Sequence, residues 1–117
     1  MLFKVKLPWP PKELSPNSRP HWAAKAKAAK AYRRECYLLT LAEYKKVEFE
    51  GKYHLYFDFY PKTRRRPDDD NCLASAKSGR DGIADAMGVD DKRFISHPLV
   101  KEETGGYVMV TVVRSPE

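Results

Sequence analysis

The sequence predicts a small domain of the α/β (α+β) class, in which a mixed β-sheet of about four strands packs against two main helices. Three observations predict it: several segments alternate between apolar and polar residues, two longer segments have helical composition, and prolines or glycines separate them. The expected order is strand, helix, strand, helix, strand, strand, for which helices packed on a small sheet are the simplest architecture. At 117 residues we expect one domain, with bounds 1–117.

The first half is expected to contain a strand, an extended loop and a long helix. Residues 2–7 alternate as a half-buried strand does, and the prolines that follow end it. Residues 21–46 are rich in Ala, Lys, Arg, Leu and Glu and lack Gly and Pro, which predicts a helix. Apolar residues at three- and four-residue steps predict its buried stripe: Ala29, Tyr32, Cys36 and Leu39.

The second half is expected to begin with the clearest strand, residues 52–60, which Pro61 ends. Residues 70–87 predict a second helix that Gly88 stops, although Gly79 and Gly82 inside it each disfavour helix by about 1 kcal/mol against alanine. A short strand at 98–101, a glycine turn at 105–106 and a strand at 107–114 complete the order.

Charge is distributed unevenly along the chain. The net charge is +6, but residues 1–66 carry 16 Lys and Arg against 6 Asp and Glu, a net +10, and residues 67–117 carry 6 against 10, a net −4. A basic balance favours a polyanionic partner, whereas a concentrated acidic cluster would repel phosphate unless a divalent metal lay at it.

The acidic cluster is Asp68, Asp69 and Asp70, followed after the predicted helix by Asp90 and Asp91. In an extended segment, Asp68 and Asp70 face one side and Asp69 the other. Two converging carboxylates favour a hard cation such as Mg²⁺, for which Mn²⁺ can substitute, and Asp90 and Asp91 complete the site if the chain returns to it. The alternative is a solvated turn or helix cap, which an isolated run of aspartates more often forms.

Two cations of the predicted second helix are candidates for work at phosphate. Helical geometry places Asp70, Lys77 and Asp81 on one face, where Lys77 can stabilise negative charge on a phosphodiester in its transition state. Arg80 falls within the apolar stripe and must therefore pair with an acid or reach phosphate.

A basic run, Lys62, Arg64, Arg65 and Arg66, directly precedes the acids. It either holds phosphate beside the metal or is a solubilising loop or protein interface. The lysines and arginines of the first helix have the same two interpretations, a DNA contact or a solvated face. Trp9, His21 and Trp22 can stack on exposed bases, although aromatics in small domains more often belong to the core.

The remaining chemistry-bearing residues are predicted to be structural. Cys36 and Cys72 have no metal-clip or disulfide spacing and are expected to be reduced core thiols. His54 and His97 lie at no zinc-like spacing. The chain has no apolar run of the roughly 20 residues that span a bilayer and no signal-like N-terminus, so we expect a soluble cytoplasmic protein.

Taken in order, these motifs resemble the RusA family of Holliday junction resolvases, over most of the chain. The resemblance rests on the segment Leu-Pro-Trp-Pro-Pro at 7–11, on Asp-Asp-Asp-Asn at 68–71 after basic residues, on Asp-Gly-Ile at 81–83 and on Val-Asp-Asp at 89–91. It implies catalytic aspartates at Asp68, Asp70 and Asp91 with Asp90 beside them, and a catalytic lysine at Lys77. That lysine lies seven residues after Asp70, whereas family members often place it about one turn after the corresponding aspartate.

The resemblance implies a Mg²⁺-dependent homodimer that presents two active sites to branched DNA and nicks opposing strands with metal-activated water, with no small-molecule cofactor. Two other functions fit the same residues. One is a non-catalytic nucleic-acid-binding module that uses the basic first half. The other is a metal nuclease that acts on flaps or RNA.

Overall fold

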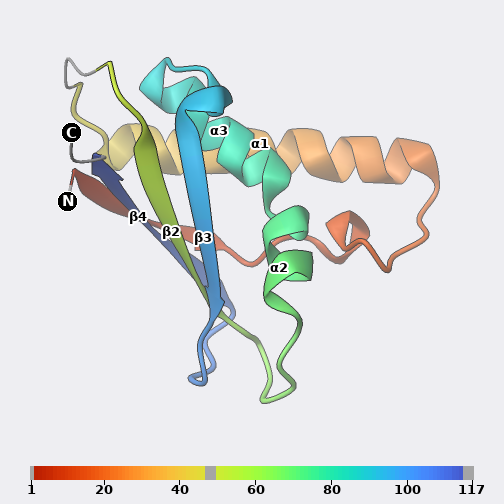
Figure 1. Cartoon of the computed structure of the whole chain (residues 1–117). Helices are drawn as coiled ribbons and strands as arrows, with labels where there is room; N and C mark the ends of the chain where they lie inside the picture. The colour runs from red at the N-terminus through yellow and green to blue at the C-terminus, as the bar shows by residue number, and fades with distance from the viewer. Residues whose placement is uncertain (1, 47–49, 115–117) are drawn as a thin grey trace.

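The fold is a mixed α+β structure in which a four-stranded sheet carries three α-helices. The computed structural model describes residues 2–46 and 50–114. Its elements, in chain order, are β1 (Phe3–Pro8), η1 (Lys12–Leu14), α1 (Trp22–Glu43), β2 (Tyr53–Tyr60), α2 (Asp69–Ser75), α3 (Lys77–Met87), η2 (Asp91–Arg93), β3 (Phe94–Val100) and β4 (Tyr107–Arg114). All three α-helices lie on one side of the sheet (Figure 1).

The sheet has the strand order β1-β4-β2-β3, so β1 and β3 are its edges. β4 pairs antiparallel with both β1 and β2, whereas β2 and β3 are parallel. The parallel pair needs a crossover connection, which α2 and α3 provide. The acidic segment therefore follows β2 by way of the basic loop, and β3 begins after α3 and η2.

The core lies between the sheet and the helices. Alternate strand residues enter it and are fully buried, among them Leu7, Leu55, Phe57, Phe59, Val108, Val110 and Val112. From α1 come Tyr32 and Cys36, and from α3 come Ile83 and Met87. The Tyr32 hydroxyl donates to the Pro8 carbonyl oxygen over 2.7 Å, which ties α1 to the end of β1.

The predicted stripe of the first helix was wrong at one position. Ala29 packs against the core and Tyr32 and Cys36 are buried, but Leu39 is 37% exposed and Thr40 is buried in its place. Burial of a hydroxyl is tolerated here because Thr40 Oγ1 donates to the Cys36 carbonyl oxygen over 2.7 Å.

The predicted second helix is two helices, α2 and α3, which meet at Ala76. This residue has φ −92° and ψ 5°, outside the helical range, and is fully buried. The two halves are fixed to different partners: α2 is bound to the end of β3, whereas α3 packs along α1. Because these partners lie in different directions, one straight helix cannot satisfy both.

Gly79 and Gly82 lie where α3 crosses α1. A Cβ at Gly82 would collide with the carbonyl oxygen of Arg33, and one at Gly79 would lie 2.7 Å from Tyr32 Cε2. The residues that disfavour helix in the sequence are therefore those that let the two helix backbones approach.

The third strand runs from Phe94 to Val100, not from 98 to 101 as predicted. Its outward edge is occupied by side chains: Arg80 Nη2 donates to the Phe94 carbonyl oxygen (3.2 Å), and Asp69 Oδ1 accepts from the Val100 amide (3.1 Å). Pro98 is one of the alternate residues of β3 whose backbone groups point outward, as those of Phe94 and Val100 do. Because proline has no N–H, this position has no outward donor. These groups protect the edge from pairing with another strand.

Candidate functional site

The three consecutive aspartates have three different environments. Asp68 is the N-cap of α2, and its Oδ1 accepts from the amides of Asp70 (2.8 Å) and Asn71 (3.3 Å). Asp69 Oδ1 accepts from the Val100 amide, and Asp70 is in the first helical turn. The helix cap that sequence analysis left open is thus formed, and the extended geometry expected for Asp68 and Asp70 ends at Asp68.

Asp70 lies at a solvent-facing hollow, which we call the Asp70 hollow. Its volume is about 400 Å³, and it is lined by Asp70, Leu73, Ala74, Lys77, Arg80 and Ser96. The helical positions recur at steps of three or four, which places them along one side of α2 and α3. Asp70 and Lys77 both line this hollow, whereas Asp81, which was predicted to share their face, does not line it.

Arg80 forms the far wall of the Asp70 hollow and is held by several acceptors. Its Nε donates to Ser96 Oγ (2.9 Å), its Nη1 to Asp91 Oδ2 (3.3 Å), and its Nη2 to the carbonyl oxygens of Asp91 (3.3 Å) and Phe94. The prediction that Arg80 must pair with an acid or reach phosphate is confirmed by the Asp91 pair. This network joins α3, η2 and β3 around one guanidinium.

Lys77 is the more exposed cation of the hollow, with 70% of its side chain exposed to solvent. Its Nζ lies 3.2 Å from Asp81 Oδ2, one helical turn further along α3. An exposed i,i+4 pair of this kind is weak, about 0.3–0.5 kcal/mol, so the ammonium group can leave Asp81 for a phosphate.

Asp90 and Asp91 do not reach the first acidic segment. Asp69 binds the last residue of β3, whereas Asp91 lies three residues before the first residue of β3. The two acidic segments therefore lie at opposite ends of a strand that spans about 20 Å (Figure 1). Asp90 caps η2, and the hydrogen bond from the Lys92 amide lowers the pKa of its carboxyl group. The return of the chain that would place Asp91 beside Asp70 is not formed.

Within residues 2–46 and 50–114, no group of three or more His, Cys, Asp or Glu side chains is arranged to hold a metal ion. A shared site made by Asp68, Asp70 and Asp91 of one chain is therefore not formed in this structure. The carboxylates that remain close in sequence, Asp68 and Asp70, are both exposed to solvent.

The residues of the basic run differ in position: three of them line a hollow, and one is exposed outside it. Lys62, Arg65 and Arg66 line a second hollow of about 300 Å³ together with Trp9, Pro61, Thr63 and Pro67, which we call the basic hollow. Arg64 is exposed outside it. Arg66 Nη2 also donates to the Val100 carbonyl oxygen (2.8 Å), so it fixes the loop to β3 as well as lining the hollow.

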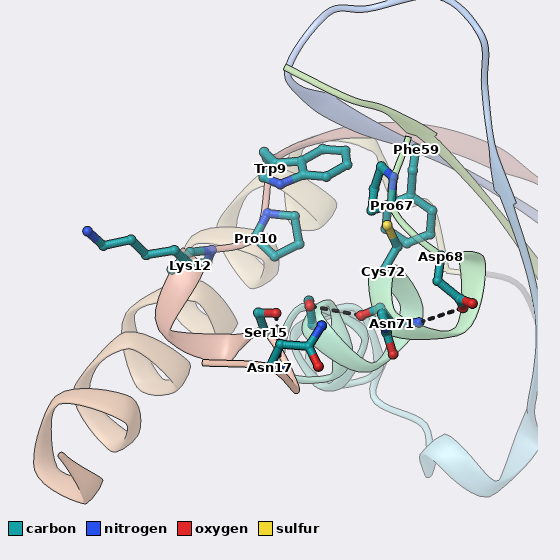
Figure 2. Close-up of a pocket in the computed structure, with 12 residues that line it drawn as sticks. Trp9, Pro10, Lys12, Ser15, Asn17, Phe59, Pro67, Asp68, Asn71 and Cys72 are labelled. Carbon is teal, nitrogen blue, oxygen red and sulfur yellow. Dashed lines mark hydrogen bonds between the residues drawn. The ribbon is translucent and has the colours of Figure 1, made fainter. Parts of the chain in front are cut away.

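A deeper cavity lies beside Asp68, between the loop after β1 and α2 (Figure 2). This Trp9 cavity has a volume of about 240 Å³ and is lined by Trp9, Pro10, Pro11, Lys12, Ser15, Asn17, Phe59, Pro67, Asp68, Asn71, Cys72 and Ser75. The Trp9 ring packs edge-on against Phe59, with centroids 6.0 Å apart. Trp9 is thus half-buried at a cavity wall, whereas Trp22 is 76% exposed on α1.

The chain was compared with known proteins. No family model matches it. An uncharacterized protein of Xylella fastidiosa (strain Temecula1 / ATCC 700964) is 48% identical over 115 residues, an alignment that covers 92% of this chain and 74% of the Xylella protein. The chain belongs to the family of this Xylella protein. This relationship assigns no activity to the chain.

The Trp9 cavity is not evident from the sequence, because its walls come from residues up to 66 positions apart. The Leu-Pro-Trp-Pro-Pro segment was the available signal, since prolines that stiffen a loop around a tryptophan favour a rigid concave wall. The contact between His54 Nδ1 and His97 Nε2 (2.7 Å), on the sheet face without helices, was missed for the same reason. Both predicted core thiols, Cys36 and Cys72, are free and buried as expected.

The described part of the chain contains no helix long and apolar enough to cross a membrane.

Proposed function

We propose that this chain is a Mg²⁺-dependent, structure-specific DNA endonuclease of the RusA type, which resolves four-way junctions by paired nicks. The observation that carries the proposal is the Asp70 hollow, where an exposed carboxylate faces the same solvent-filled space as Lys77 and Arg80. A lone acid would repel a phosphodiester, and two cations alone would bind it without cutting. A carboxylate that holds a metal, beside cations that hold phosphate, suits hydrolysis.

In this proposal Mg²⁺ binds at the start of α2. In nucleic-acid enzymes this ion is commonly bound by one or two carboxylates and by substrate phosphates, and not by a complete protein cage. Asp68 uses Oδ1 as a helix cap, and its Oδ2 makes no hydrogen bond to a described residue. Asp68 and Asp70 therefore offer free carboxylate oxygens two residues apart. When bound, the metal would supply a more acidic water and polarise a phosphate oxygen.

The cations of the Asp70 hollow act on the phosphodiester. Lys77, with its exposed ammonium group, can follow charge as it develops on the phosphate oxygens. Arg80 is fixed by Ser96, Phe94 and Asp91 and presents a guanidinium of constant position. In this proposal Asp91 is a positioning residue, because it acts through Arg80.

The basic hollow suits the DNA backbone. Lys62, Arg65 and Arg66 line it and directly precede the acidic segment in the chain. Asp69 and Arg66 hold the Val100 amide and carbonyl, so the loop that carries these charges is anchored to the sheet. A homodimer with two such surfaces matches a nearly two-fold branched substrate.

The test is cleavage of a synthetic mobile four-way junction in Mg²⁺ or Mn²⁺ by the native protein and by Asp70→Asn. We expect the substitution to reduce cleavage by about two orders of magnitude or more, because it removes a metal-binding charge, and to leave or strengthen DNA binding. Glu103→Gln is the control, since Glu103 is an exposed carboxylate outside the Asp70 hollow. Native protein that binds the junction but cuts it with neither metal rejects the proposal.

A second candidate is a non-catalytic nucleic-acid-binding module. The favouring observation is that no three-carboxylate metal group occurs among the described residues, while α1 exposes Lys25, Lys27, Lys30 and Arg34. This module would bind DNA without cutting, and Asp70→Asn would leave its activity unchanged. Competition between a junction, a flap and an RNA hairpin separates the resolvase from a nuclease with another substrate.

A further inference from the structure

The Trp9 cavity differs in chemistry from the hollows that flank it. Figure 2 shows the ring of Trp9, Pro10 and Pro67 on one side and the polar Asn17 and Asn71 on the other. The carboxamide groups of both asparagines make no hydrogen bond to another described residue, so their donors and acceptors are available to a ligand. Flat apolar walls with free amides opposite suit a planar ring with a polar edge.

Part of the cavity wall is made of uncharged side chains. Phe59 and Cys72 are buried there, and the ring of Trp9 lies beside Phe59. A charged group such as phosphate would lose its hydration against these side chains, whereas an aromatic base would not.

The cavity adjoins the basic hollow. Trp9 and Pro67 line both this cavity and the basic hollow, and Asp68 lies at its acidic side. A nucleotide whose phosphates rest on Lys62 and Arg65 can therefore direct its base toward Trp9. A volume of about 240 Å³ is below the usual range of small-molecule pockets, about 300–1,000 Å³, and suits one base better than a longer segment.

We propose that the Trp9 cavity binds a single unpaired base, extruded from the branch point, by stacking on Trp9 and hydrogen bonding to Asn17 and Asn71. The inference rests on the proposed action on DNA and adds a substrate feature to it: the enzyme selects junctions because only a branched or unpaired strand releases a base. Extruding a base costs a few kcal/mol in a duplex and least where pairing is already interrupted. Fully paired DNA would therefore leave the cavity empty.

The chain contains two tryptophans, which allows a direct test by fluorescence. Trp22→Phe leaves Trp9 as the only tryptophan, and the reciprocal Trp9→Phe leaves the exposed Trp22. Each protein is titrated, in EDTA, with single-stranded oligothymidylate and with a blunt duplex of equal length, while end-label anisotropy measures the bound fraction. We expect the Trp9 emission to fall with the single strand and to stay unchanged with the duplex at the same bound fraction.

Equal quenching of Trp9 by both DNAs, or none at saturation with the single strand, overturns the inference. So does quenching of Trp22 alone. A second variant, Asn71→Ala, removes an amide from the cavity, and it should weaken binding of the single strand by about 5- to 10-fold without changing duplex affinity. Asn71 is half-buried at a helix start, where alanine is well tolerated.

The outcomes separate this inference from the proposed function. Junction cleavage with no change in Trp9 emission keeps the nuclease and rejects the base site. Trp9 quenching specific to the single strand, with no cleavage in Mg²⁺ or Mn²⁺, keeps the base site on a nucleic-acid-binding protein and rejects the nuclease.

Discussion

Asp68, Asp69 and Asp70 have identical side chains and are assigned different roles by the backbone around them. Strand-like alternation predicted that Asp68 and Asp70 face one side, but α2 begins at Asp69, and Asp68 and Asp70 line different hollows. The sequence did not reveal that Asp69 would bind an amide 31 residues away, because that contact depends on the parallel pairing of β2 and β3. The resemblance implied that Asp91 joins Asp70, which required a return of the chain that η2 and β3 do not make.

The side chain of Lys77 provides a prediction at this scale. Lys77→Met keeps the aliphatic stem and removes the charge, so we expect junction cleavage to fall by about 10- to 100-fold while the free energy of unfolding changes by less than about 1 kcal/mol. Cleavage rates at saturating DNA and chemical denaturation measure the two effects. Lys46→Met, at an exposed lysine beyond α1, is the control. An unchanged rate would exclude Lys77 from the chemistry.

The elements were predicted to different degrees, for identifiable reasons. β2 and β4 alternate regularly between buried and exposed residues, so their bounds were read to within one residue. β3 is an edge strand with a proline and polar residues along it, and its alternation is weak, so only its end was detected. The break at Ala76 could not be predicted, since alanine is a strong helix former and the bend follows from tertiary contacts.

The crossing of α1 and α3 provides a second prediction. Gly82→Ala should lower the free energy of unfolding by about 1–3 kcal/mol, because the added methyl group meets the Arg33 carbonyl. The helix preference of alanine, about 1 kcal/mol, acts in the opposite direction and is smaller than the clash. Urea denaturation measures the change. A variant as stable as the native protein would mean that α1 and α3 separate without cost.

The same pair of helices provides a prediction about pH. Arg33 Nε and Nη2 donate to the two carboxylate oxygens of Asp85 (2.7 and 2.9 Å), and this contact holds the pKa of Asp85 below its usual value. The contribution to stability is complete above the unfolded pKa, about 3.9, and is lost as pH falls through the lower folded pKa.

Arg33→Gln should therefore reduce the free energy of unfolding by up to about 1 kcal/mol at neutral pH, the scale of an exposed ion pair. The difference from the native protein should shrink toward zero at about pH 2. Denaturation curves at the two pH values measure it. A difference that grows as the solution becomes acidic would contradict the assignment.

At the scale of the whole molecule, one side of the sheet is covered by helices and the other is open to solvent (Figure 1). The open side carries Tyr56, Ile95 and Leu99, each at least 40% exposed, next to the contact between His54 and His97. Apolar residues grouped on an exposed sheet face are typical of protein interfaces. This face is where we expect the proposed homodimer to form.

Light scattering coupled to gel filtration tests that expectation. The native protein should have the mass of a dimer, and the double substitution Ile95→Asp and Leu99→Asp should shift it to the monomer by placing charges in an apolar contact. The double substitution Lys27→Asp and Lys30→Asp, at exposed positions of α1 on the other side of the sheet, is the control for added acidic charge. A native monomer at all concentrations would remove the dimer from the proposal.

The last residue of β3 is fixed on its outward side by two charged side chains, with Asp69 on its amide and Arg66 on its carbonyl. Strand ends normally fray, and their amide protons exchange with solvent quickly. Here the exchange of one proton, that of Val100, depends on whether the turn with the aspartates is intact. The exchange rate of the Val100 amide proton therefore reports whether that turn is ordered. It can be measured without a substrate and without a cleavage assay.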